Sequence, residues 1–337
     1  MIGSIDIALL WAFIIAFAVF VYVVMDGFDL GLGILFPLFP EKADRDVIMN
    51  TVAPVWDGNE TWLVLGGGGL MAAFPLAYAV LMPALYSPIV AMLIGLVFRG
   101  VAFEFRWRTK QSGRNRWDIA FAGGSLLAAL AQGIALGAVL QGVHVEGRHY
   151  GGGWWDWLTP FSILTGLAIV IGYSLLGATW LVMKTEGELR DRAYHLSWRL
   201  MTAMLCAIAA VSIATPFLHV QYTDRWFSWP NIVLTAPVPI AVAGVAVLLM
   251  RSLANKDDYR PFLLSLALFA LSYAGLGISM YPYIVPQSIT IWQAASPLSS
   301  QLFMLVGVAI LIPLILGYTG WAYWVFRGKV KPGAGYH

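Results

Sequence analysis

Long apolar runs, separated by short polar breaks, make up most of the chain. A bilayer core is about 30 Å thick, so a helix that spans it needs about 20 mostly apolar residues. Backbone groups in lipid must be hydrogen-bonded within their own segment, which favours helices over open sheets. The pattern therefore predicts an all-α integral membrane protein with nine transmembrane helices, near residues 5–37, 53–78, 80–103, 118–142, 159–184, 196–218, 232–251, 261–281 and 300–326.

Two stretches about 145 residues apart share one pattern, an apolar helix end followed by a short charged turn. They are Gly31 to Asp46 and Leu176 to Asp191. Parallel repeats of this kind occur in membrane proteins. If the repeat is real, residues 1–337 form a single membrane domain of two four-helix bundles, 1–142 and 159–281, with an additional helix at 300–326. The alternative is a set of nine helices without internal symmetry.

The composition supports a membrane protein, because 60% of the residues are hydrophobic and only 11% are charged. Soluble domains carry about 25% charged residues. The loops are too short for a soluble domain, and no pattern suggests a nucleic-acid partner. The single cysteine, Cys206, lies in an apolar run, so we expect it to be a small buried residue. A disulfide within the chain is excluded.

The basic residues are distributed unevenly between the two sides of the predicted helices. Of the 20 lysines and arginines, all but Arg99, Arg148 and Arg225 fall on one side, from Lys42 in the first loop to Lys331 near the end. Loops rich in lysine and arginine stay in the cytoplasm. We therefore predict a bacterial inner-membrane protein whose N-terminus is outside and whose C-terminus is cytoplasmic.

Acidic residues inside the predicted spans are the clearest candidates for function. Asp26 and Asp29 lie in the cytoplasmic half of the first span, and Asp57 and Glu60 lie in the first turns of the second. Residues three apart share one helix face. Ionisable residues at membrane depth are rare, and chains of them carry protons in pumps and transporters.

The third span adds Arg99 and, at its cytoplasmic end, Glu104. Five residues correspond to about 140° of rotation around a helix, so these two side chains pair poorly. We expect Arg99 to meet Asp57, Glu60 or Asp29 on a neighbouring helix, since an unpaired buried charge is costly. One hypothesis is a salt-bridge network that only fixes helix packing. The other is a cytoplasmic proton path, which the surplus of carboxylates favours.

Four consecutive glycines, Gly66 to Gly69, remove the side chains from a full turn of the second span. The gap allows close approach of another helix or of a ligand tail, and packing is the simpler interpretation. Haem requires an axial ligand inside a pocket, and among the histidines only His219 is placed to face a bundle. We therefore expect no metal and no haem in this chain.

Three motifs resemble one family. DGFDLGLG at 26–33, APVWDGNETWL at 53–63 and FRGVAFEFRWR at 98–108 are similar to subunit II of cytochrome bd-type quinol oxidases, including the cyanide-insensitive branch. The resemblance covers essentially the whole chain, and WDGNETWL at this distance from DGFD is its most specific part. Family members often carry Gln at position 60 and Asp at position 104, so the family's functional roles transfer less firmly to Glu60 and Glu104.

The resemblance implies a division of labour. Subunit I, the expected partner, carries haems b and d and the quinol site, and small single-helix subunits occur in some complexes. Subunit II is haem-free, although it can hold a structural quinone or lipid, and the complex reduces dioxygen to water with cytoplasmic protons. On this basis Asp57 is the proton-uptake carboxylate, and Asp29, Asp26, Glu60 and Glu104 are the other acids of the path. The supporting residues are Trp56, Asn59 and Arg99.

Two alternatives compete with an oxidase subunit. A self-contained proton-coupled transporter would explain the acidic layer and the repeat, but no broken helices occupy matching positions in both halves, as transporters often require. In a purely structural subunit the acids would only pack helices.

Overall fold

The computed structural model describes residues 6–330, so the first residue of the expected span 5–37 and the basic residue Lys331 lie outside the described part. Eight helices in this part are long and apolar enough to cross a membrane. They are α1 (Ile7–Leu35), α5 (Tyr86–Arg108), α6 (Arg114–Leu140), α7 (Pro160–Lys184), α8 (Gly187–Ala214), α11 (Pro237–Ala254), α12 (Arg260–Met280) and α14 (Leu298–Val325).

Shorter elements connect these helices. They are η1 (Phe36–Leu38), α2 (Lys42–Val52), α3 (Trp56–Ala73), α4 (Pro75–Ala84), η2 (Gln111–Gly113), β1 (Val145–Glu146), β2 (His149–Tyr150), η3 (Thr215–Phe217), α9 (Val220–Phe227), α10 (Asn231–Thr235), β3 (Tyr283–Val285), β4 (Ile289–Thr290) and α13 (Ile291–Ala294). The strands form two small antiparallel hairpins, β1–β2 and β3–β4. The all-helical membrane architecture predicted from the sequence is thus present.

The boundary predicted between the second and third spans is wrong. The expected span 53–78 is interrupted at Phe74, whose φ of −133° and ψ of 62° are not helical. Pro75 explains the break, because proline disfavours helical geometry in the residue before it. α3 therefore has 18 residues, or about 27 Å of helix. α4 continues to Ala84 and α5 begins at Tyr86.

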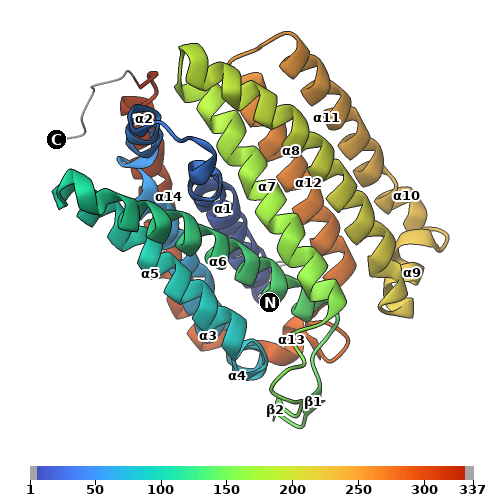
Figure 1. Cartoon of the computed structure of the whole chain (residues 1–337). Coiled ribbons are helices and arrows are strands. Elements are labelled where there is room, and N and C mark those ends of the chain that lie inside the picture. Colours follow the sequence, from blue (N-terminus) through green and yellow to red (C-terminus); the bar gives the residue numbers. More distant parts are fainter. Residues whose placement is uncertain (1–5, 331–337) are drawn as a thin grey trace.

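The helices gather in two groups (Figure 1). On the right of the view α7, α8, α11 and α12 lie together, and on the left α1, α3, α5 and α6 lie together, with α14 beside them. The groups meet along α1 and α7, where Gly31 faces Gly177. A Cβ at Gly31 would lie 1.8 Å from the carbonyl oxygen of Tyr173, and one at Gly177 would lie 2.6 Å from the carbonyl carbon of Gly31. Small residues allow this backbone contact.

The two ends of the molecule differ in character. The β1–β2 hairpin lies at the lower end in Figure 1, whereas α2 and the C-terminal end of α14 lie at the upper end. α1 runs from the lower end to the upper one, so its acidic turn, near its C-terminus, lies toward α2. This places the acids of α1 close to the end that holds the arginine-rich segment around η2.

The prediction that Cys206 is buried is wrong, because the residue is exposed on α8. Met201, Met204 and Ala207 are the buried positions of that part of the helix, and Cys206 lies on another face. Lipid tails are as apolar as a protein core, so an apolar sequence does not reveal which face of a membrane helix is buried.

Candidate functional site

Asp26 and Asp29 lie on one turn of α1 and are both fully buried. Their spacing of three residues directs both carboxylates to the same side of the helix, as expected. The neighbouring Gly27 lies against the ring of Tyr173 on α7, where an added Cβ would be 2.7 Å from a ring carbon. α1 is therefore held closely by α7 on one side and presents its carboxylates on the other.

Arg99 on α5 is the centre of the site and is also fully buried. Its Nη1 lies 2.7 Å from Asp26 Oδ1 and 4.0 Å from Asp29 Oδ2, and its Nη2 donates a 2.8 Å hydrogen bond to Glu60 Oε2. The contact with Asp26 is a close ion pair without hydrogen-bond alignment. Three carboxylates from two helices thus surround one guanidinium. The expected approach of Asp29 and Glu60 to Arg99 is present.

α3 contributes an amide and a carboxylate to this cluster. The Nδ2 group of Asn59 donates a 2.9 Å hydrogen bond to Asp29 Oδ2, and the hydroxyl of Tyr323 on α14 donates one of the same length to Asn59 Oδ1. The Glu60 side chain is 31% exposed, whereas those of Asp26, Asp29 and Arg99 are completely buried. Glu60 therefore connects the interior acids with the surface.

Trp56, the first residue of α3, covers the arginine. Its ring stacks on Phe103 with centroids 5.0 Å apart and planes 10° apart, and the Arg99 guanidinium carbon lies 5.7 Å from its centroid. Such a position over an aromatic face stabilises a cation. The structure therefore places Trp56, predicted as a supporting residue, directly against Arg99.

Two of the predicted acids are placed differently. Asp57 is exposed, and it forms no ion pair or hydrogen bond with the residues at 6–330. Successive helical residues differ by about 100°, so Asp57 lies about 160° away from the inward-facing Asn59. Glu104 is exposed and pairs with Arg108 at 3.3 Å, one turn further along α5. The structure does not bring Glu104 to the Arg99 cluster.

A polar chain that the sequence analysis missed adjoins the acids. The Nε2 group of Gln132 on α6 donates a 2.7 Å hydrogen bond to the hydroxyl of Tyr22, and the hydroxyl of Tyr173 donates a 2.8 Å one to Gln132 Oε1. Tyr22 lies four residues before Asp26, on the same face of α1, and this spacing was available in the sequence. Tyr323 had no such signal, because it lies 264 residues away from Asn59.

Several polar atoms of the cluster have no hydrogen-bond partner in the described part of the chain. They are both carboxylate oxygens of Asp26, Oδ1 of Asp29, and Nε and Nη1 of Arg99, although Asp26 Oδ1 and Arg99 Nη1 lie 2.7 Å apart as an ion pair. Buried polar atoms are nearly always hydrogen-bonded, so exceptions call for a functional explanation. Adjacent carboxylates at membrane depth can bind a proton and pass it to one another. The cluster is suited to proton transfer, and its contacts also fix three helices against each other.

The four glycines of α3 divide into two faces. A Cβ at Gly66 would lie 3.0 Å from Val19, and one at Gly69 would lie 3.1 Å from Ile15, so this face packs on α1. Gly67 and Gly68 have no atom of residues 6–330 within 4 Å of an added Cβ. Close helix packing therefore accounts for Gly66 and Gly69.

A second charged cluster joins α2, α5 and α6. Arg106, which is almost completely buried, contacts Asp118 and Asp46 at 2.6 Å each, and Arg45 contacts Asp118 at 2.9 Å. Arg114 lies 3.8 Å from Asp46. In the sequence, the arginines of this cluster indicated only sidedness, and their pairing with Asp46 and Asp118 was not predicted.

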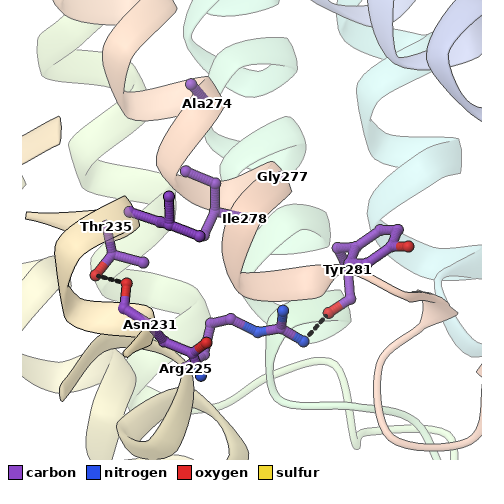
Figure 2. A pocket seen from close by; sticks show the side chains of 8 residues that line it. Arg225, Asn231, Thr235, Ala274, Gly277, Ile278 and Tyr281 are labelled. Carbon is purple, nitrogen blue, oxygen red and sulfur yellow. Dashed lines mark hydrogen bonds between the residues drawn. The ribbon is translucent and has the colours of Figure 1, made fainter. Parts of the chain in front are cut away.

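A cavity of about 440 Å³ lies between α9, α10 and α12, away from both clusters. In Figure 2 the guanidinium of Arg225 reaches the carbonyl oxygen of Tyr281, and Ala274 and Ile278 form an apolar wall. Within residues 6–330, no group of three or more His, Cys, Asp or Glu side chains is arranged to hold a metal ion. His219 Nε2 lies 2.7 Å from the carbonyl oxygen of Gln141.

Comparisons with known proteins agree with this architecture. The family described as cytochrome bd terminal oxidase subunit II matches residues 7–326. The chain is 30% identical to cytochrome bd-I ubiquinol oxidase subunit 2 of Escherichia coli (strain K12), over 95% of this chain and 94% of that one. It is 28% identical to cytochrome bd ubiquinol oxidase subunit 2 of Bacillus subtilis (strain 168), over 96% of each chain. A chain of the bd oxidase from Geobacillus thermodenitrificans has a similar fold, with a TM-score of 0.72 and 17% identity, over 95% of this chain and 99% of that one.

Proposed function

The chain belongs to the cytochrome bd terminal oxidase subunit II family, and we propose that within such an oxidase it delivers cytoplasmic protons through the Arg99 cluster. The resemblance inferred from its three motifs is confirmed. The chain is a subunit of a terminal respiratory oxidase, and the oxidoreductase activity is that of the whole complex. Family membership replaces the hypothesis of a self-contained transporter.

The partner follows from the family. A subunit II implies a subunit I, and we propose that subunit I holds haems b and d and oxidises a quinol, with this chain free of haem. The relatives from Escherichia coli and Bacillus subtilis are named as ubiquinol oxidase subunits, which supports a quinol as the electron donor of the complex.

The chain is a multi-pass protein of the bacterial inner membrane, and we propose that it crosses the membrane nine times. α3 is the ninth span, since its length of about 27 Å nearly matches the bilayer core. The end that carries α2 and the arginines around η2 faces the cytoplasm, because basic segments remain on that side. The N-terminus is then outside, and the Arg99 cluster lies in the cytoplasmic half of the membrane.

The proposed path begins at Asp57, which is exposed in the first turn of α3. It continues through Glu60, the partly exposed ligand of Arg99, to the buried Asp26 and Asp29. The observation that carries the proposal is this gradient from an exposed carboxylate to buried ones, around one fixed cation. Glu104 is not part of the path, since it pairs with Arg108 instead.

Substitution of the exposed carboxylate tests the proposal. Asp57→Asn removes the proton-binding group without disturbing any buried contact, so the complex should assemble with its normal haem absorbance. We expect oxygen consumption with excess quinol to fall by at least about tenfold, because a positioned proton-transfer group contributes a factor of this order or more.

Glu104→Gln is the matched control, since it removes an exposed carboxylate on α5, and it should leave turnover unchanged. An assembled Asp57→Asn complex with normal turnover would exclude Asp57 from the path. A purely structural role for the cluster would be indicated if Glu60→Gln also left both turnover and its pH dependence unchanged.

A further inference from the structure

The second charged cluster encloses a small cavity. Its volume is about 200 Å³, and it lies where the start of α2, the end of α5 and the start of α6 meet. It is lined by Lys42, Arg45, Arg106, Ser112, Arg114, Asn115 and Asp118. Pockets for drug-sized ligands measure about 300–1,000 Å³. This cavity is smaller and fits a single compact polar group.

The charge of the cavity is unbalanced. Four basic side chains line it, and two carboxylates, Asp118 and Asp46, are shared among the three arginines. Lys42 is exposed and forms no ion pair with residues 6–330. These four basic and two acidic side chains together have a formal excess of two positive charges. This excess attracts an anion with up to two negative charges.

Arg106 and Arg45 are held in place by their partners. Arg106 is bonded to two carboxylates, and Arg45 also donates a 2.7 Å hydrogen bond to the carbonyl oxygen of Phe39. Arg114 is less well satisfied, because its contact with Asp46 is 3.8 Å long and its buried Nε has no hydrogen-bond partner in the described part of the chain. Its guanidinium, 5.7 Å from the ring centroid of Trp107, retains donors for a further ligand.

The backbone contributes donors as well. α6, a helix of 27 residues, begins at Arg114 and has Gly113 at its N-cap, so no side chain caps its first turn. The first N–H groups of a helix need acceptors from outside the helix. Together with the positive end of the helix dipole, they favour phosphate and similar anions. The uncapped turn includes Asn115, which itself lines the cavity.

We propose that this cavity is a binding site for a phosphate ester, held by Arg114, Lys42 and the first turn of α6. Arginine suits this chemistry, because its planar fork donates two parallel hydrogen bonds to phosphate oxygens. The site is separate from the Arg99 cluster and independent of the proposed proton path.

The surroundings indicate how such a group would reach the cavity. Phe105 and Ile119, on the helices that border it, are exposed apolar residues, and Phe105 packs on Trp117 with ring centroids 5.2 Å apart. Exposed apolar residues and tryptophans next to basic side chains are typical of a membrane–water interface. The phosphate of an anionic lipid can reach the cavity along this border, and a soluble phosphate ester can reach it from the cytoplasm.

Native mass spectrometry of the purified, delipidated oxidase complex tests the site. The probes are dioctanoyl phosphatidylglycerol, its zwitterionic analogue dioctanoyl phosphatidylcholine, glycerol 3-phosphate and inorganic phosphate. We expect saturable binding of the anionic lipid, of the soluble phosphates, or of both. Lipid binding alone identifies a headgroup site, whereas binding of glycerol 3-phosphate or phosphate identifies a site for soluble anions.

Matched variants locate the binding. Arg114→Gln should weaken it about tenfold, the loss expected for a charge-assisted hydrogen bond. Arg116→Gln removes the same charge from an exposed position on the same turn and should have no effect. Lys42→Gln changes an exposed residue without an ion pair, so it should weaken binding while leaving the fold intact. No saturable binding, or equal effects of Arg114→Gln and Arg116→Gln, would overturn the proposal.

Discussion

Replacement of Arg99 by glutamine removes the only cation within residues 6–330 that contacts the buried carboxylates of α1. The side chains of Arg99, Asp26 and Asp29 are all 0% exposed, and the Arg99–Asp26 distance is 2.7 Å. Removal of one partner of a buried ion pair costs about 3–5 kcal/mol, because the remaining charge is left uncompensated. We expect Arg99→Gln to lower the thermal midpoint of the solubilised complex markedly.

A second substitution shows that the loss arises from charge. Arg99→Gln with Asp26→Asn removes both members of the closest pair, so the double variant should have a higher midpoint than Arg99→Gln alone. Arg108→Gln is the control, since the side chains of Arg108 and Glu104 are 79% and 60% exposed. Exposed pairs of this spacing contribute about 0.3–0.5 kcal/mol.

The midpoints can be measured by fluorescence-detected size-exclusion chromatography after heating. If Arg99→Gln and Arg108→Gln had the same midpoint, or if the double variant were less stable than Arg99→Gln, the reasoning about the buried pair would be refuted.

Two further predictions concern the two ends of α1. Gly31→Ala should lower the same thermal midpoint, since its Cβ would lie 1.8 Å from the carbonyl oxygen of Tyr173 and overpacking costs about 1–3 kcal/mol or more. Gly67→Ala, whose Cβ would have no atom of the described residues within 4 Å, should not change the midpoint, and equal effects would contradict the α1–α7 contact. The hydrogen bond from Trp292 lowers the pKa of Asp6 below its usual value. The stabilisation is therefore present above the usual carboxyl pKa of about 4 and lost as pH falls through the lower folded value. The protection of the first-turn amides of α1 from hydrogen exchange, taken relative to their intrinsic exchange rates, should decrease at low pH. Asp6→Asn should abolish that dependence, and an unchanged dependence in this variant would refute the prediction.

Much of the candidate site could be predicted from local sequence. The spacing of Asp26 and Asp29 fixed their common face, and the alternation of spans placed Glu60 and Arg99 at a similar depth. Asp57 was assigned to the same cluster because it lies three residues before Glu60. The inward face of α3 is centred nearer Asn59, and only the docking of α3 on α1 decides that orientation.

Contacts between distant segments had no sequence signal. Tyr323 approaches Asn59 from the last helix, and Gln132 joins Tyr22 to Tyr173 from a different one. Neither Tyr323 nor Gln132 is marked as a site residue by the pattern of its own span. Their partners depend on how the helices pack.

By itself the sequence determined that this is a helical membrane protein, which family it belongs to, and which residues place charge inside the bilayer. These properties are local, since the length of an apolar run and the cost of a buried carboxylate do not depend on neighbouring helices. The tertiary structure decided which carboxylates meet Arg99, which face of each helix is covered, and where basic side chains enclose a cavity. Lipid and protein interiors are similarly apolar, so only the packing of helices distinguishes one face from another.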